Sequence, residues 1–144
     1  MIIPDLNLLL YAEVDAFAVH ATARRWWEGA LNGERQVGLA PVVVFGFIRI
    51  GTNRRVFDDP MSVEDATERV RSWFSTGGVV LLSTGSQYLE TAFGLLKAAG
   101  TGANLTTDAQ IAAHAIESNG EVYSNDSDFG RFEGLRWRNP LVES

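Results

Sequence analysis

The chain has 144 residues, 46 % of them hydrophobic, a formal net charge of −6 at pH 7 and no cysteine. A chain of this length is one ordinary domain, so we expect a single domain over 1–144, and the lack of cysteine excludes disulfides and thiolate metal sites and fits the cytoplasm. The apolar runs LLLYA and VVVFGFI are far shorter than the roughly 20 residues of a membrane span, and no basic segment precedes an apolar one, so neither a membrane contact nor a secretory signal is expected.

Short apolar strands alternate with amphipathic helices in the first half of the chain. Asp5 lies at the carboxyl end of the first strand, and Asn7 is expected to cap a helix that begins at Leu8. Pro41 suits the first position of a helix, and Ser62 is expected to cap another. The predicted elements are a strand over 1–7, a helix over 17–33, a strand over 36–40, and helices over 41–51 and 62–78.

The second half repeats this alternation. Thr107 and Gln110 have the spacing of a capping box at the start of an alanine-rich helix, which Asn119 and Gly120 end. The predicted elements are a fully buried strand over 79–83, helices over 86–100 and 106–120, a strand over 121–124, and an edge strand over 134–140. The pattern predicts an α/β fold with a mostly parallel sheet of about five short strands and helices on both faces, whose ligands bind beyond the carboxyl ends of the strands.

Four aspartates fall at that edge of the predicted sheet. Asp5 follows the first strand, Asp126 and Asp128 follow the fourth, and Asp108 begins the helix that leads into the fourth. Ionised carboxylates about 4 Å apart repel by about 4 kcal/mol at an effective dielectric of 20, so a shared pocket needs protons or a cation. Oxygen ligands without His or Cys favour Mg²⁺ or Mn²⁺.

Each aspartate also has a structural explanation. Asp108 is stabilised by the helix dipole, and Asp126 and Asp128 suit a turn. Asp5 is harder to explain without function, because a carboxylate beside a buried strand needs compensation. His20 and His114 are expected at the surface or in packing, and the sequence has neither G-x-S-x-G nor a P-loop motif.

Eleven of the twelve basic residues are arginine. The planar guanidinium suits phosphate, so an acidic protein can still hold nucleic acid locally. Arg49, Arg54 and Arg55 are candidates for binding an RNA backbone, whereas solvated helix faces are favoured for Arg24 and Arg25. Nucleotide composition of the genome explains the arginine bias equally well.

Three segments together resemble a known family. They are MIIPDLNLLLYA, APVVVFGFIRIGTNRRVF and NLTTDAQIAAHAIESNGEVYSNDSDFGRFEGLRWRNP. The most specific part is D-A-x-x-A-A from Asp108, followed 18 residues later, at Asp126, by the centre of S-x-D-x-D-F. The chain resembles the PIN-domain ribonucleases of VapC toxin type, including a mycobacterial subgroup, nearly from end to end.

The resemblance implies a sandwich of helices around a parallel sheet, and Mg²⁺- or Mn²⁺-dependent cleavage of RNA, with tRNA or ribosomal RNA as the expected substrates. It also implies a cognate VapB antitoxin as inhibitor and a homodimer. The residues it implicates are Asp5, Asp108 and Asp126 as catalytic metal ligands, Asp128 as an auxiliary carboxylate, and Ser124 and Asn7 around them.

One position departs from the family pattern. The family has a Glu on the helix after the second strand, and Gly46 stands at about that place here. Glu13 is expected in solvent rather than as its substitute. A degenerate PIN domain that binds antitoxin or RNA without cutting is therefore the alternative. A receiver or phosphatase with a nucleophilic aspartate is disfavoured, because the first motif reads D-L-N and the only lysine, Lys97, lies within a helix.

Aromatic residues are candidates for an antitoxin groove, which a partner helix would fill. Core packing explains them equally well. The four residues considered are Trp26, Trp27, Phe45 and Phe47.

Overall fold

The centre of the fold is a sheet of five short strands. The computed structural model describes residues 1–142. The strands are β1 (Ile2–Pro4), β2 (Val37–Leu39), β3 (Val79–Leu81), β4 (Glu121–Tyr123) and β5 (Trp137–Arg138). Their order in the sheet is β3-β2-β1-β4-β5, and all four neighbouring pairs are parallel. The sequence prediction of about five mostly parallel strands is confirmed.

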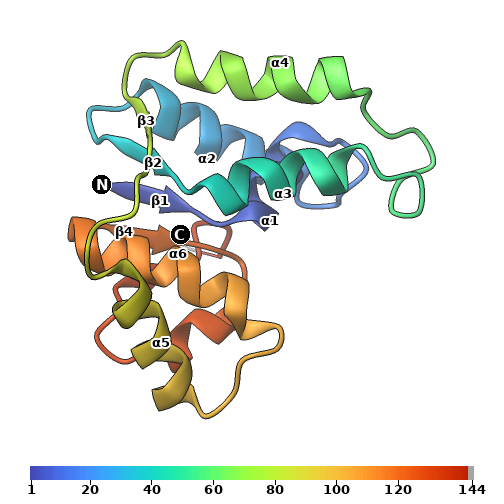
Figure 1. Ribbon diagram of the computed structural model, residues 1–144. Helices are drawn as coiled ribbons and strands as arrows, with labels where there is room; N and C mark the ends of the chain where they lie inside the picture. The colour runs from blue at the N-terminus through green and yellow to red at the C-terminus, as the bar shows by residue number, and fades with distance from the viewer. Residues whose placement is uncertain (143–144) are drawn as a thin grey trace.

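Six α-helices and one 3-10 helix connect the strands. They are α1 (Leu6–Glu13), α2 (His20–Asn32), α3 (Pro41–Gly51), α4 (Val63–Phe74), α5 (Tyr88–Ala99), α6 (Leu105–Ser118) and the 3-10 helix η1 (Ser127–Arg131). Figure 1 shows α2, α3 and α4 gathered around the β2–β3 side of the sheet, and α5 and α6 around the β4 side. This arrangement confirms the predicted α/β sandwich. No helix within residues 1–142 is both long and apolar enough to cross a membrane.

The core forms because the inner strands direct apolar side chains toward the helices, which contribute large rings. Ile3 on the central strand β1 and Val122 on its neighbour β4 have no exposed surface. Trp73 on α4 packs edge-on against Trp27 of α2, with ring centroids 5.7 Å apart, and stacks on Phe47 of α3 at 4.9 Å. These contacts fix α4 over α2 and α3, so Trp27 and Phe47 are core residues rather than groove residues.

Three local predictions are wrong. Asp5, not Asn7, caps α1, which begins at Leu6. Helix α6 begins at Leu105 and has no side-chain cap bond. The capping box therefore does not form. Strand β3 is not fully buried, because it is the edge of the sheet and its last residue, Leu81, is 57 % exposed.

The direction of winding changes between β1 and β4. From β1 the chain proceeds to β2 and β3 on one side, and it then crosses to β4 and β5 on the other. The loops that follow β1 and β4 therefore separate from each other at the carboxyl edge, which is where ligands of open α/β sheets bind. Asp5 follows β1 and Asp126 follows β4 at this point.

Candidate metal centre

Asp5 is held rigidly at the end of β1. Its Oδ1 accepts a hydrogen bond from the Leu6 amide at 2.7 Å, and its Oδ2 accepts one from the Ser124 hydroxyl at 2.6 Å. The residue is only 7 % exposed. Burial raises the pKa of its carboxyl, the bonds from Ser124 and Leu6 oppose that rise, and the charge of Asp126 adds to it. Asp5 therefore joins the loops after β1 and β4.

Three further carboxylates meet beside it. Asp108 lies in the first turn of α6, Asp126 precedes η1, and Asp128 lies in the first turn of η1. One oxygen from each carboxylate lies within 4.8 Å of the oxygens of the other two. The Asp126 carboxylate accepts a hydrogen bond from the Asp128 backbone amide at 2.9 Å, which ties the Asp126 side chain to the start of η1.

The electrostatics of this cluster favour a bound proton or cation. The pKa of Asp108 rises from 3.8 to about 7, first because of burial and then because of the charges of Asp5, Asp126 and Asp128. A carboxylic acid that ionises near neutral pH exchanges its proton readily for a metal ion. An oxygen-only donor set fits a hard divalent cation such as Mg²⁺ or Mn²⁺, as the sequence predicts.

The grouping differs from the predicted ligand set in one respect. The structure brings Asp108 and Asp126 together, as expected, but the third member of the close group is Asp128 rather than Asp5. Both oxygens of Asp5 already accept hydrogen bonds. Asp5 is nevertheless near enough to raise the pKa of Asp108. Its role as a direct ligand stays a prediction.

Ser124 connects these groups. Its hydroxyl donates to Asp5 and accepts from the Asp126 amide at 2.9 Å, and the Asn7 side-chain amide lies 3.4 Å from the same oxygen. The residue has no exposed surface. Asn7 also approaches the Asn125 amide, at 3.5 Å. The two predicted supporting residues thus contact the site, with Ser124 making the shorter bonds.

The family's additional Glu has no replacement on α3. A Cβ atom on Gly46 would lie 2.9 Å from Leu6 Cδ2, so any side chain there displaces this leucine. Leu6 directly follows Asp5 in the chain. Glycine at this position lets the end of the Leu6 side chain lie directly against α3.

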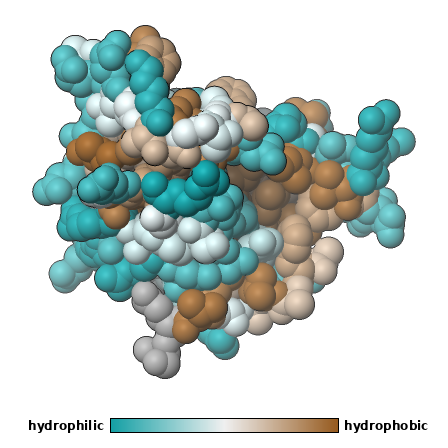
Figure 2. Space-filling view, turned by 90° about the horizontal axis from the view of Figure 1, so that it is seen from below, coloured by the Kyte–Doolittle hydropathy of each residue, from teal (hydrophilic) through white to brown (hydrophobic). Residues whose placement is uncertain are grey.

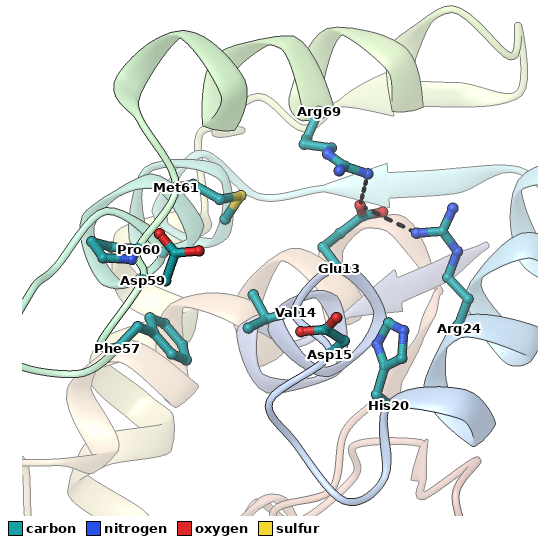
Figure 3. Close-up of a pocket in the computed structure, with 11 residues that line it drawn as sticks. Glu13, Val14, Asp15, His20, Arg24, Phe57, Asp59, Pro60, Met61 and Arg69 are labelled. Carbon is teal, nitrogen blue, oxygen red and sulfur yellow. Dashed lines mark hydrogen bonds and ion pairs between the residues drawn. The ribbon is translucent and has the colours of Figure 1, made fainter.

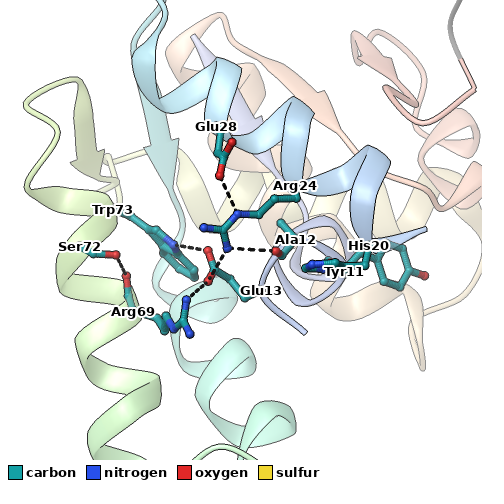
Figure 4. Close-up of polar contacts among 9 residues, drawn as sticks. All are labelled: Tyr11, Ala12, Glu13, His20, Arg24, Glu28, Arg69, Ser72 and Trp73. Atoms are coloured by element: carbon teal, nitrogen blue, oxygen red, sulfur yellow. Dashed lines mark hydrogen bonds and ion pairs between the residues drawn. The ribbon is translucent and has the colours of Figure 1, made fainter. Parts of the chain in front are cut away.

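Glu13 does not reach solvent, which makes the prediction for it wrong. Its side chain is 6 % exposed and forms ion pairs with Arg24 at 3.4 Å and Arg69 at 3.0 Å (Figure 4). It also accepts a hydrogen bond from Trp73 Nε1 at 3.2 Å. These bonds join α1, α2 and α4. Sequence reasoning missed them because the partners are 11, 56 and 60 residues away.

Glu13 lines a pocket of about 320 Å³ whose lining includes neither Asp5 nor any of the three clustered aspartates (Figure 3). Its charged lining has both signs, since Asp15 and Asp59 face the same space as Arg24 and Arg69. The His20 ring is held by the Tyr11 carbonyl at 2.8 Å. The pocket is therefore a separate feature and not part of the acidic site.

The remaining candidates divide between surface and interior. Arg49, Arg54 and Arg55 are exposed, and within residues 1–142 none of them forms an ion pair. His114 is buried, 4 % exposed, against the ring of Tyr88. Its role in packing was one of the two expected outcomes.

Comparison with known proteins assigns the chain to a family. Residues 2–135 match the PIN domain family model, and the chain belongs to this family. Within it, the chain groups with the VapC proteins. It is 47 % identical over 143 residues to Ribonuclease VapC33 of Mycobacterium tuberculosis, covering 99 % of this chain and 100 % of that one. It is 40 % identical to Ribonuclease VapC37 of the same organism, with 97 % of each chain covered.

Solved structures share the fold at lower identity. Mycobacterium tuberculosis VapC20, described as a toxin that cleaves the sarcin-ricin loop, superposes with a TM-score of 0.70 at 20 % identity, covering 94 % of this chain and 99 % of that one. The VapBC2 complex of Rickettsia felis, bound to a promoter DNA fragment, gives a TM-score of 0.70 at 17 % identity, with 96 % and 98 % covered.

Proposed function

We propose that this protein is the toxin of a type II toxin–antitoxin system and acts as a metal-dependent endoribonuclease. The observation that carries the proposal is the group of three carboxylates within 4.8 Å of one another, together with a pKa of about 7 for Asp108. Relatives of 47 % and 40 % identity named ribonucleases support the same activity.

The residues of the site have separate tasks in this proposal. Asp108 and Asp126, with Asp128 beside them, offer the oxygen ligands, and Asp5 either completes the set or holds Ser124 in place. When bound, Mg²⁺ or Mn²⁺ neutralises these charges and polarises an RNA phosphate. We propose that water beside the cation, rather than the ribose 2′-hydroxyl, is the nucleophile, and this mechanism needs no histidine. The bond from phosphorus to O3′ breaks, which leaves a 5′-phosphate and a 3′-hydroxyl.

In this proposal, exposed arginine side chains bind the RNA backbone. Arg49 lies in the last turn of α3, and Arg54 and Arg55 follow in the next loop. Phosphate contacts make binding weaken steeply as salt rises, so RNA binding by the Asp108→Asn variant between 50 and 200 mM salt tests them. A flat salt response would remove these arginines from the proposal.

The negative charge of the acidic cluster and the exposed apolar side chains each indicate a protein partner. A VapB-type antitoxin with an Arg or Lys side chain would satisfy the acidic cluster as a cation does, and neighbouring structures contain VapB with VapC. A homodimer is proposed because large apolar side chains lie exposed on α3 and α5, namely Phe45, Leu89 and Phe93. Figure 2 shows a mostly hydrophilic face in which apolar side chains gather around a hollow on the right.

A degenerate binding module is the second candidate, and Gly46 in place of the family's Glu favours it. The decisive experiment is cleavage of total RNA by the purified protein with Mg²⁺, Mn²⁺ or EDTA, with sequencing of the new ends. Asp108→Asn is the test variant. Asp65→Asn is its control, because Asp65 also lies in the first turn of a helix but outside the cluster.

Metal-dependent cuts with 5′-phosphate ends, absent from Asp108→Asn and present in Asp65→Asn, are the expected result. Cuts with 2′,3′-cyclic ends, or cleavage that persists in EDTA, would overturn the proposed chemistry. A protein that binds Mn²⁺ and RNA but leaves RNA intact would be the binding module.

A further inference from the structure

A single residue, Asn125, separates the two parts of the site that follow β4. Ser124 before it bonds to Asp5, and Asp126 after it belongs to the carboxylate group. The conformation at Asn125 therefore sets how Asp126 is presented to Asp108. Asn125 itself is exposed, so no core packing holds it.

A side chain from the end of β5 holds Asn125 instead. The Asn139 side-chain amide donates a hydrogen bond to Asn125 Oδ1 at 2.8 Å. The other end of the same side chain, Oδ1, accepts from the Leu141 amide at 3.0 Å. Asn139 is thus fixed at one end to its own turn, and its other end restrains the turn that carries Asp126.

The short edge strand places Asn139 where this contact is possible. Strand β5 has only two residues, and Arg138 accepts the Ser124 amide through its carbonyl at 3.0 Å. Tyr123 pairs with Arg138 in the register of β4 and β5, so Asn139 is level with Ser124 and Asn125 is one residue further along. Because the two parallel strands end next to each other, the Asn139 side chain reaches Asn125.

We propose that Asn139 is a positioning residue of the acidic site. Its hydrogen bond to Asn125 holds the Ser124–Asp126 turn in one conformation. In that conformation the Ser124 hydroxyl donates to Asp5 and the Asp126 carboxylate faces Asp108. It touches neither metal nor substrate. The effect of Asn139 on RNA cleavage rests on the proposed function. Its effects on the turn and on cation binding do not depend on that function.

Two variants with the same added charge isolate this bond. Asn139→Asp removes the donor to Asn125 but keeps an oxygen for the Leu141 amide. Asn125→Asp keeps an oxygen that accepts from Asn139, so the bond remains. Each variant places one extra negative charge beside the site, and a difference between them therefore reports the hydrogen bond and not the charge.

The first measurement is amide hydrogen exchange at Asp126 and Asp128, which needs neither metal nor RNA. Losing one hydrogen bond is expected to speed exchange about fivefold in Asn139→Asp relative to Asn125→Asp. The amides of β1 and β4 should exchange alike in both variants, because the core is untouched. An increase spread over all amides would show general destabilisation and would overturn the proposal.

The second measurement is Mn²⁺ binding by titration calorimetry. The dissociation constant is expected to be about fivefold higher in Asn139→Asp than in Asn125→Asp. If the two variants exchange and bind Mn²⁺ equally, Asn139 is only a turn residue and the inference is wrong. If the wild-type protein cuts no RNA, the proposed function fails, while exchange and Mn²⁺ binding still decide the role of Asn139.

Discussion

Replacing Asp108 by Asn should make the metal-free protein more stable, although it should abolish cleavage. The folded state holds the pKa of Asp108 at about 7, against 3.8 without the fold. At 1.36 kcal/mol for each pH unit, that difference corresponds to about 4 kcal/mol opposing ionisation. Because the side chain is partly solvated, we expect about 2–4 kcal/mol.

The sign follows from proton binding. A carboxyl whose pKa is raised by folding contributes stability that is fully present below pH 3.8 and is lost as the pH rises through about 7. The wild-type protein should therefore lose stability relative to Asp108→Asn between pH 4 and pH 8. The gap should be small at pH 4 and reach its full size at pH 8.

Urea unfolding in EDTA at pH 4, 6 and 8 measures this gap. Asp65→Asn, which removes an exposed carboxylate from the first turn of α4, should change stability by less than about 1 kcal/mol. Mn²⁺ at pH 8 should stabilise the wild-type protein and leave Asp108→Asn nearly unchanged. A gap that does not grow with pH would refute the electrostatic account of the cluster.

Three other substitutions test separate parts of the fold. Ser124→Ala removes the donor to buried Asp5 and should cost about 1–3 kcal/mol in urea unfolding and weaken cleavage; unchanged values would show that this bond is dispensable. Glu13→Gln should lower the melting temperature through loss of two ion pairs, yet the folded fraction should still cut RNA, since Glu13 lies outside the cluster. Trp73→Phe should destabilise more than Trp27→Phe, because Trp73 Nε1 bonds to Glu13 whereas Trp27 Nε1 has no partner within residues 1–142. Equal losses in thermal melts would contradict that ranking.

The pattern of the sequence predicted the order of strands and helices because each element carries its own signal. Pro41 begins α3 and Gly100 ends α5 in the left-handed conformation, as local chemistry requires. The start of α1 was misplaced because both Asp5 and Asn7 are good caps. Tertiary structure selected Asp5, whose second oxygen bonds to Ser124, 119 residues away.

The sequence predicted an acidic site at this edge of the sheet, but it did not predict which aspartates lie closest together. Parallel strands bring their carboxyl ends to one edge, so the convergence of aspartates followed from the order of elements. That Asp128 rather than Asp5 joins the close group depends on η1 and on the two bonds that occupy Asp5. Likewise, nothing near Glu13 in the sequence indicates that two distant arginines and Trp73 bury it.

Because of the order in which the chain forms the strands, two separate stretches of sequence supply the aspartates of one site. Strands β1 to β3 and Asp5 come from the chain before Leu82, whereas the three clustered aspartates come from the chain after Tyr88. A protein cut between these points yields two pieces, neither with a complete set of carboxylates. RNA cleavage would return only where the pieces meet, so each half could be fused to a different protein and the pair used to report their encounter in a cell.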